Sequence, residues 1–274
     1  MTGTFGARLT AAVASHGNLC AGIDPHPGLL AGWGLTDDTA GLETFAMACV
    51  EAFAGHVAVV KPQSAFFERH GSRGIAVLER VLQAFAGTGT LAILDAKRGD
   101  IGSTMDGYAD AYLAVRAPLG ADAVTLSPYL GFGSLAPGLD AAADADRGVF
   151  VLARTSNPEG EEVQLASVGG RTVAQYVVDA AAERNAGAEP LGDVGVVIGA
   201  TTDHGLDLSA LNGPVLAPGL GAQGAGPADI PARFAGLAGI VLPAASRSVL
   251  KAGPDVATLR GAAESLRDEL SAAV

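Results

Sequence analysis

Residues 91–101 read LAILDAKRGDI, an apolar run that ends in a charged segment. An uninterrupted apolar run is typical of a parallel β-strand that is buried on both faces, because a half-exposed strand alternates apolar with polar residues. Seven further runs of this kind occur along the chain, and turn-forming residues bound them. They lie at about 18–24, 56–61, 122–127, 148–154, 194–200, 214–219 and 239–243. The sequence therefore predicts eight buried parallel strands.

Alanine-rich stretches with helical character separate these runs, and parallel strands need crossover connections of that length. The expected helices lie at about 4–15, 42–53, 74–85, 105–117, 173–183 and 255–270. Eight βα units without a linker predict a single (β/α)8 TIM barrel, one α/β domain over residues 1–274. The alternative is a doubly wound open sheet, which normally carries a glycine-rich loop after its first strand. Residues 24–27 read DPHP instead, which favours the barrel.

Charge and cysteine usage limit the possible partners and the location. The chain has 17 basic and 29 acidic residues, a formal net charge of -12. The electrostatic field of a protein with this negative net charge repels phosphate backbones and anionic membranes. We therefore expect no nucleic acid partner and no membrane association. No apolar run approaches the roughly 18 residues of a membrane-spanning helix. Cys20 and Cys49 lie in apolar segments without metal-ligand spacing, which indicates reduced thiols and a cytoplasmic protein.

The scarce lysines point to the chemistry of the site. The chain has three lysines, and Lys61 and Lys97 end predicted strands, at the barrel face where active sites lie. Lysine can deliver a proton, which the permanently charged guanidinium of arginine cannot do. Asp95 precedes Lys97 by two residues, so both side chains point to one face of an extended strand, while Arg98 points elsewhere. A structural ion pair at the barrel end is the alternative interpretation.

Other polar segments follow the later strands. GLGAQG at 219–224 and SRS at 246–248 follow strands seven and eight, where barrels build phosphate sites from backbone N–H groups and an arginine. The polar segment at about 155–171 follows strand five and is predicted to be a non-helical active-site lid. The histidines show no metal-ligand spacing, and a capping role is expected for His26, so we expect no metal.

The motif DAKRGDI at 95–101 resembles the Asp-x-Lys-x-x-Asp signature of the orotidine 5'-monophosphate decarboxylase family. GIDPHP at 22–27 and VKPQS at 60–64 resemble the longer bacterial branch of that family, and the resemblance runs from about 18 to 250. It implies decarboxylation of orotidine 5'-monophosphate to uridine 5'-monophosphate and CO2 in pyrimidine nucleotide biosynthesis, without a cofactor.

The resemblance also implies a role for each matching residue. Lys97 would protonate C6, and Asp95 would lie against the substrate carboxylate. Removing CO2 from C6 leaves a carbanion without an electron sink, which a fixed cation would stabilise. The resemblance further implies that Asp24 and Lys61 bind the ribose, that Ser156 binds the pyrimidine, and that Gln223 and Arg247 bind the phosphate. It also implies a homodimer, in which Asp100, Ile101 and Thr104 complete the active site of the neighbouring subunit.

Two other functions remain possible at this point. Metal-dependent sugar-phosphate decarboxylases share the barrel and the motif, but they carry an acidic metal ligand on strand two, where this chain has Lys61. An ammonium group there would repel a divalent cation. The second alternative is a non-catalytic phosphate-binding barrel, which retention of the scarce lysines and the matching carboxylates disfavours.

Overall fold

The structure, a computed structural model, describes residues 3–201, 203–221 and 224–273. Eight strands close a barrel in the order β1-β10-β9-β8-β5-β4-β3-β2, and every neighbouring pair is parallel. The barrel strands are β1 (Cys20–Ile23), β2 (Val59–Pro62), β3 (Leu91–Arg98), β4 (Ala123–Leu126), β5 (Gly148–Arg154), β8 (Val194–Ile198), β9 (Gly213–Pro218) and β10 (Gly239–Ala245). All eight predicted strands and the (β/α)8 barrel are confirmed. The remaining two strands, β6 (Ser167–Val168) and β7 (Arg171–Thr172), form a separate antiparallel hairpin.

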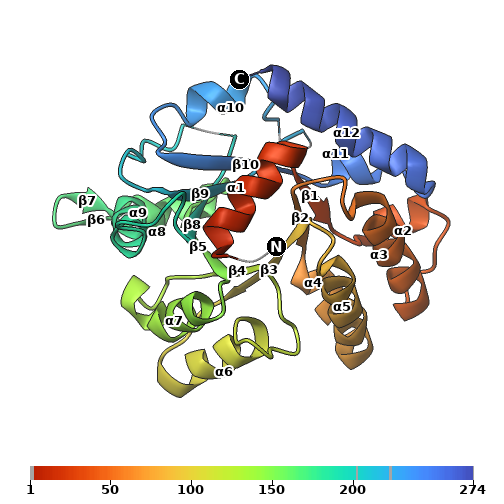
Figure 1. Ribbon diagram of the computed structural model, residues 1–274, viewed down its shortest axis with the longest axis horizontal. Coiled ribbons are helices and arrows are strands. Elements are labelled where there is room, and N and C mark those ends of the chain that lie inside the picture. The colour runs from red at the N-terminus through yellow and green to blue at the C-terminus, as the bar shows by residue number, and fades with distance from the viewer. Residues whose placement is uncertain (1–2, 202, 222–223, 274) are drawn as a thin grey trace.

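Helices surround this barrel on its outer side, except for α1 (Phe5–His16), which crosses one end of it (Figure 1). The others are α2 (Pro27–Gly32), α3 (Thr39–Phe53), α4 (Ser64–Glu68), α5 (Gly71–Phe85), α6 (Gly102–Tyr112), α7 (Ala136–Asp144), α8 (Glu161–Gln164), α9 (Val173–Arg184), α10 (Asp229–Arg233), α11 (Arg247–Leu250) and α12 (Val256–Ala272), with 3-10 turns η1 (Phe132–Leu135) and η2 (Pro158–Gly160). Side-chain caps start α1, α3, α9 and α12; before α3, for example, the Asp38 carboxylate accepts from the Gly41 amide at 2.9 Å. In the described part of the chain, none of the helices is long and apolar enough to cross a membrane.

The strands are apolar on both faces because they separate two clusters of buried residues. One face packs against the surrounding helices, and the other fills the barrel interior. In β4, for example, Val124 belongs to the outer cluster and Ala123 to the inner one. This division explains why the strand segments read as continuous apolar runs.

Helix α1 closes the amino-terminal end of the barrel, and Figure 1 shows it crossing the middle of the strand ring. Phe5 is fully buried and meets the Phe150 ring edge-to-face, with 6.0 Å between the ring centroids. The Gly6 amide donates to the Asp193 carboxylate at 2.6 Å, which joins α1 to the entry of β8. The opposite, carboxyl-terminal end of the barrel is thereby left as the open face.

Several connections differ from the prediction. Helix α6 ends at Tyr112 instead of residue 117, because the following chain turns back: the Leu119 amide donates to the Ala111 carbonyl at 3.0 Å. Helix α7, which has Pro137 in its first turn, was not predicted. Between β8 and β9, the described residues 199–201 and 203–212 contain no helix, so not every strand is followed by one. The segment 155–171 was expected to be non-helical, but it contains η2 and α8.

Candidate active site

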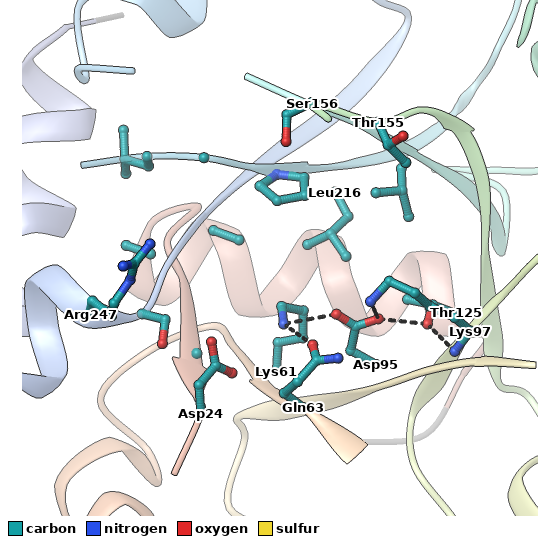
Figure 2. A pocket seen from close by; sticks show the side chains of 18 of the residues that line it. Asp24, Lys61, Gln63, Asp95, Lys97, Thr125, Thr155, Ser156, Leu216 and Arg247 are labelled. Carbon is teal, nitrogen blue, oxygen red and sulfur yellow. Dashed lines mark hydrogen bonds and ion pairs between the residues drawn. The ribbon is translucent and has the colours of Figure 1, made fainter. Parts of the chain in front are cut away.

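A cavity of about 580 Å³ opens at the carboxyl ends of the barrel strands. Its position agrees with the expectation that chemistry in this fold sits where the strands end. Polar side chains from most of the barrel strands or the loops after them line it (Figure 2). They are Asp24, His26, Lys61, Gln63, Asp95, Lys97, Thr125, Thr155, Ser156, Asn157, Ser246 and Arg247. The structure thus brings together six of the ten predicted site residues.

The Asp95 carboxylate is the centre of a charged cluster at one end of this cavity. Its Oδ2 accepts a hydrogen bond from Lys61 Nζ at 3.0 Å, and its Oδ1 accepts from Lys97 Nζ at 2.6 Å. Oδ1 also accepts from the Thr125 hydroxyl at 2.9 Å. Lys61 Nζ further donates to Gln63 Oε1 at 3.2 Å. One carboxylate therefore lies between two ammonium groups.

Lys97 reaches Asp95 through an irregular strand and not through the regular alternation that the sequence suggested. The register of β3 against β4 shifts between Leu94 and Arg98, and Lys97 has a φ of 49°, in the left-handed region. Its backbone amide donates to Thr125 Oγ1 at 2.9 Å. The expected contact is present, but a bulge produces it. Arg98 points away, as predicted, and its guanidinium contacts Glu68 Oε1 at 2.6 Å.

Burial and charge determine the ionisation of this cluster. Burial by itself would raise the pKa of Asp95, but Lys61 and Lys97 outweigh it and hold that pKa well below its usual range. Burial would also lower the pKa of Lys61, yet the Asp95 and Asp24 carboxylates outweigh that effect and raise it. Both groups are 7% exposed. Asp95 and Lys61 are therefore both ionised at neutral pH, and Lys97, whose side chain is 45% exposed, extends from this pair into the cavity.

Asp24 lies beside this cluster, at the end of β1. Its Oδ1 is buried and has no hydrogen-bond partner among the described residues. A buried carboxylate oxygen without a donor is costly, so such an atom is suited to accept a hydrogen bond from a ligand. His26 follows two residues later, and its Nδ1 accepts from the Gly28 amide at 3.0 Å. That bond caps α2, as the sequence suggested.

The other end of the cavity carries Arg247, and Figure 2 shows it on the side opposite Lys97. Arg247 starts the short helix α11, which directly follows β10. The hydroxyls of Ser246 and Ser248 are buried without a partner among the described residues. Gly219 also lines the cavity, and it has a φ of 116°, which favours glycine. Gln223 lies outside the described residues.

The segment after β5 covers one side of the cavity with Thr155, Ser156 and Asn157. Ser156 lies against the backbone at the end of β8, because a Cβ atom added to Gly199 would be 2.9 Å from the Ser156 amide nitrogen. Buried Arg154 anchors the segment through a 2.6 Å contact between its Nη2 and Glu161 Oε1. Whether the segment acts as a lid stays a prediction.

Three predicted site residues are not among the described residues that line the cavity of their own chain. Asp100 bends back on its own loop, where Oδ1 accepts from the Ile101 amide at 2.8 Å. Ile101 is 62% exposed, and Thr104 is exposed in the first turn of α6. Asp100, Ile101 and Thr104 therefore either act outside the cavity of their own chain or have no role in a site.

Sequence reasoning missed two contacts of the cluster, those of Thr125 and Gln63. Thr125 is a single hydroxyl inside the apolar run DAVTLS, and a lone polar residue in a buried strand was the available signal. Gln63 belongs to the VKPQS motif at 60–64, which by itself indicates no role for this side chain. Among the residues that the structure describes, no group of three or more His, Cys, Asp or Glu side chains could hold a metal ion.

The fold and the cavity together define a (β/α)8-barrel enzyme with a charged site at the strand ends. Residues 17–262 match the model of the orotidine 5'-phosphate decarboxylase / HUMPS family, so the chain belongs to this family. The orotidine 5'-phosphate decarboxylase of Salinispora arenicola is 61% identical over 99% of this chain and 98% of its own. That of Streptomyces coelicolor is 56% identical over 98% of each.

Solved structures agree with this assignment. A crystal structure from Streptomyces avermitilis, assigned to an orotidine 5'-phosphate decarboxylase, has a TM-score of 0.94 and 55% identity, covering 100% of this chain and 96% of its own. The OMP decarboxylase of Leishmania donovani has a TM-score of 0.76 and 30% identity, covering 99% of each chain. The bacterial relatives confirm the resemblance to the longer bacterial branch.

Proposed function

We propose that this protein decarboxylates orotidine 5'-monophosphate to uridine 5'-monophosphate and CO2, without a cofactor. The observation that carries the proposal is the Asp95 carboxylate held between Lys61 and Lys97. The high identity to relatives with this name supports it. With it we infer a single-domain, cytoplasmic enzyme of pyrimidine nucleotide biosynthesis, since both cysteines are buried free thiols.

In the proposed reaction, the bond between C6 and the carboxylate breaks and CO2 leaves, while the electron pair stays on C6. The Lys97 ammonium donates a proton to C6, and the neutral amine regains a proton from solvent. A fixed cation at the developing carbanion is worth more in a water-poor cavity than in solution. Asp95 keeps that ammonium in place, 2.6 Å from its Oδ1.

The rest of the cavity would hold the nucleotide. The unpartnered Asp24 oxygen and the Lys61 ammonium are suited to ribose hydroxyls. Arg247, with the buried Ser246 and Ser248 hydroxyls, is suited to the phosphate, because a guanidinium can donate two parallel hydrogen bonds to phosphate oxygens. Ser156 would bind the pyrimidine, and Gln223 would assist the phosphate site.

We infer that the working unit is a homodimer, in which Asp100, Ile101 and Thr104 complete the partner's site. The exposure of Ile101 supports this, as does that of two neighbouring apolar side chains in the loop after β4. Tyr129 is 79% exposed and Leu130 is 53% exposed. Large apolar side chains left in water favour association.

Loss of orotidine 5'-monophosphate absorbance with purified protein tests the proposal. We expect full turnover in excess chelator, because the buried Lys61 ammonium occupies the place of a metal ligand and would repel a divalent cation. Activity abolished by chelation and restored by magnesium would instead support a sugar-phosphate decarboxylase. Nucleotide binding without any turnover would support a non-catalytic barrel.

A further inference from the structure

We propose that Thr125 is a positioning residue for this reaction, whose hydroxyl fixes both the Asp95 carboxylate and the backbone that carries Lys97. The inference rests on the proposed function, because the reaction concerned is the decarboxylation described above. The choice of Thr125 rests on the geometry of β3 and β4. Thr125 is 1% exposed and lies in β4, paired in register with Phe150 of β5.

The bulge in β3 creates the need for this hydroxyl. Leu94 pairs with Val124 and Arg98 pairs with Leu126, so residues 95–97 all lie opposite Thr125. Backbone amides in a bulge leave the regular ladder and need another acceptor. The Lys97 amide finds it in Thr125 Oγ1, at 2.9 Å, while its backbone adopts a φ of 49°.

The two bonds of the hydroxyl have fixed directions. A backbone amide can only donate, so Oγ1 accepts from Lys97; an ionised carboxylate can only accept, so Oγ1 donates to Asp95. That second bond is 2.9 Å long and ends on Oδ1, the same oxygen that receives the Lys97 ammonium at 2.6 Å. One hydroxyl therefore holds both partners of the ion pair, at the carboxylate and at the main chain.

This arrangement matters because the Lys97 side chain is otherwise weakly constrained. It is 45% exposed, and in the described part of the chain its ammonium contacts Asp95 alone. Without the hydroxyl, the carboxylate can rotate about its side-chain bonds and the Lys97 amide loses its acceptor. The ammonium would then be displaced from the position that proton transfer requires, and small displacements are costly for catalysis.

The test compares Thr125→Val, which keeps the shape and removes both hydrogen bonds, with Thr125→Ser, which keeps the hydroxyl. For Thr125→Val we expect kcat to fall about 10- to 100-fold, the range for hydrogen bonds to charged groups, with KM changed less than about threefold. Thr125→Ser should retain kcat within about threefold of wild type. The split between a large loss in kcat and a small change in KM separates displacement of the Lys97 ammonium from a general loss of structure, which would affect both.

Thr90→Val is the matched control. Thr90 is also buried, at 2% exposure, and its hydroxyl donates to the Val57 carbonyl at 2.7 Å, but it precedes β3 at the other end of the barrel. Thr90→Val should lower the melting temperature and leave kcat and KM unchanged. If Thr125→Val does not fold, Thr125→Cys, with a weak sulfur donor, should show an intermediate loss of kcat.

The outcomes separate the two proposals. Absence of decarboxylation by the wild-type protein would overturn the proposed function, and with it any role of Thr125 in that reaction. Normal wild-type turnover together with an unchanged kcat in Thr125→Val would overturn the role of Thr125 alone. An equal loss in Thr125→Ser and Thr125→Val would do the same, since shape and not the hydroxyl would then be responsible.

Discussion

At Asp95, two oxygens accept hydrogen bonds from two ammonium groups and one hydroxyl. Removing one partner from such a buried arrangement leaves the others unpaired, which is more costly than the loss of the bond itself. The cluster is therefore a unit, in which removing the hydrogen-bonding group of any one side chain affects the ionisation or the position of its neighbours.

Arg247 offers a prediction at the scale of a single residue. Arg247→Ala should weaken binding of uridine 5'-monophosphate by about 10- to 100-fold, because a charge-assisted contact to the phosphate is lost. Binding of uridine, which lacks the phosphate, should change less than about threefold. Isothermal titration with both ligands measures the difference.

Arg184→Ala is the control, since Arg184 pairs with Asp140 on the surface at 2.7 Å and lies outside the residues that line the cavity. It should leave both affinities unchanged. Equal losses for the nucleotide and the nucleoside in Arg247→Ala would place the phosphate elsewhere in the cavity.

The sequence predicted the Asp95–Lys97 contact, but for a reason that the structure corrects. A spacing of two residues indicates a shared face only in a regular strand, whereas Lys97 sits in a bulge with a left-handed backbone. A bulge depends on how two strands pair, and pairing is not encoded in the local sequence of β3 alone. For the same reason Thr125, which lies on the partner strand, could not be assigned from the motif.

At the scale of elements, α1 covers the end of the barrel that lies away from the cavity, and its Phe5 side chain packs into the barrel interior. Phe5→Ala should lower the free energy of unfolding by about 3 to 5 kcal/mol, the usual cost of emptying a phenylalanine site in a core. Urea unfolding followed by circular dichroism measures this. The kcat of the folded variant should stay near wild type, because α1 lies outside the cavity lining.

Val163→Ala serves as the comparison, since Val163 is 47% exposed and its truncation leaves no buried cavity. Val163→Ala should change the free energy of unfolding by no more than about 0.5 kcal/mol. A similar stability for Phe5→Ala and the wild type would show that α1 is not part of the cooperative fold.

The strands were easier to predict than the connections between them. A strand buried on both faces needs apolar residues throughout, so the runs at about 194–200 and 239–243, which contain β8 and most of β10, could be recognised without the structure. Short helices carry a weaker signal, because a single turn or two contains too few residues for periodicity. Both α8 and α10 belong to that group, and tertiary contacts such as the Arg154–Glu161 pair stabilise the first.

At the scale of the whole molecule, the position of Asp100 outside its own cavity leads to a prediction about the dimer. Lys97→Ala and Asp100→Ala should each inactivate the protein when pure. In mixed dimers one site carries both defects and the other neither, by two-fold symmetry. Random exchange should therefore restore about a quarter of wild-type activity per site, because about half of the dimers are mixed and half of their sites are intact.

Verified subunit exchange is the control for this experiment, and native mass spectrometry of the mixture provides it. Mixing Lys97→Ala with Asp95→Ala should restore no activity, because both residues line the cavity of the same chain. If exchange occurs and Lys97→Ala with Asp100→Ala also stays inactive, Asp100 acts within its own subunit.

The pairing of β1 with β10, through Cys20 and Ala244, has a consequence for the order in which the protein is made. The ribosome releases β1 before all the other barrel strands and β10 after them, so the nascent sheet keeps two open edges until β10 emerges. Open edges invite pairing with other chains until the ring is complete. Asp24 directly follows the first of these strands and Arg247 closely follows the last. A ligand that spans both side chains can therefore be captured only after β10 has been synthesised and the ring has closed.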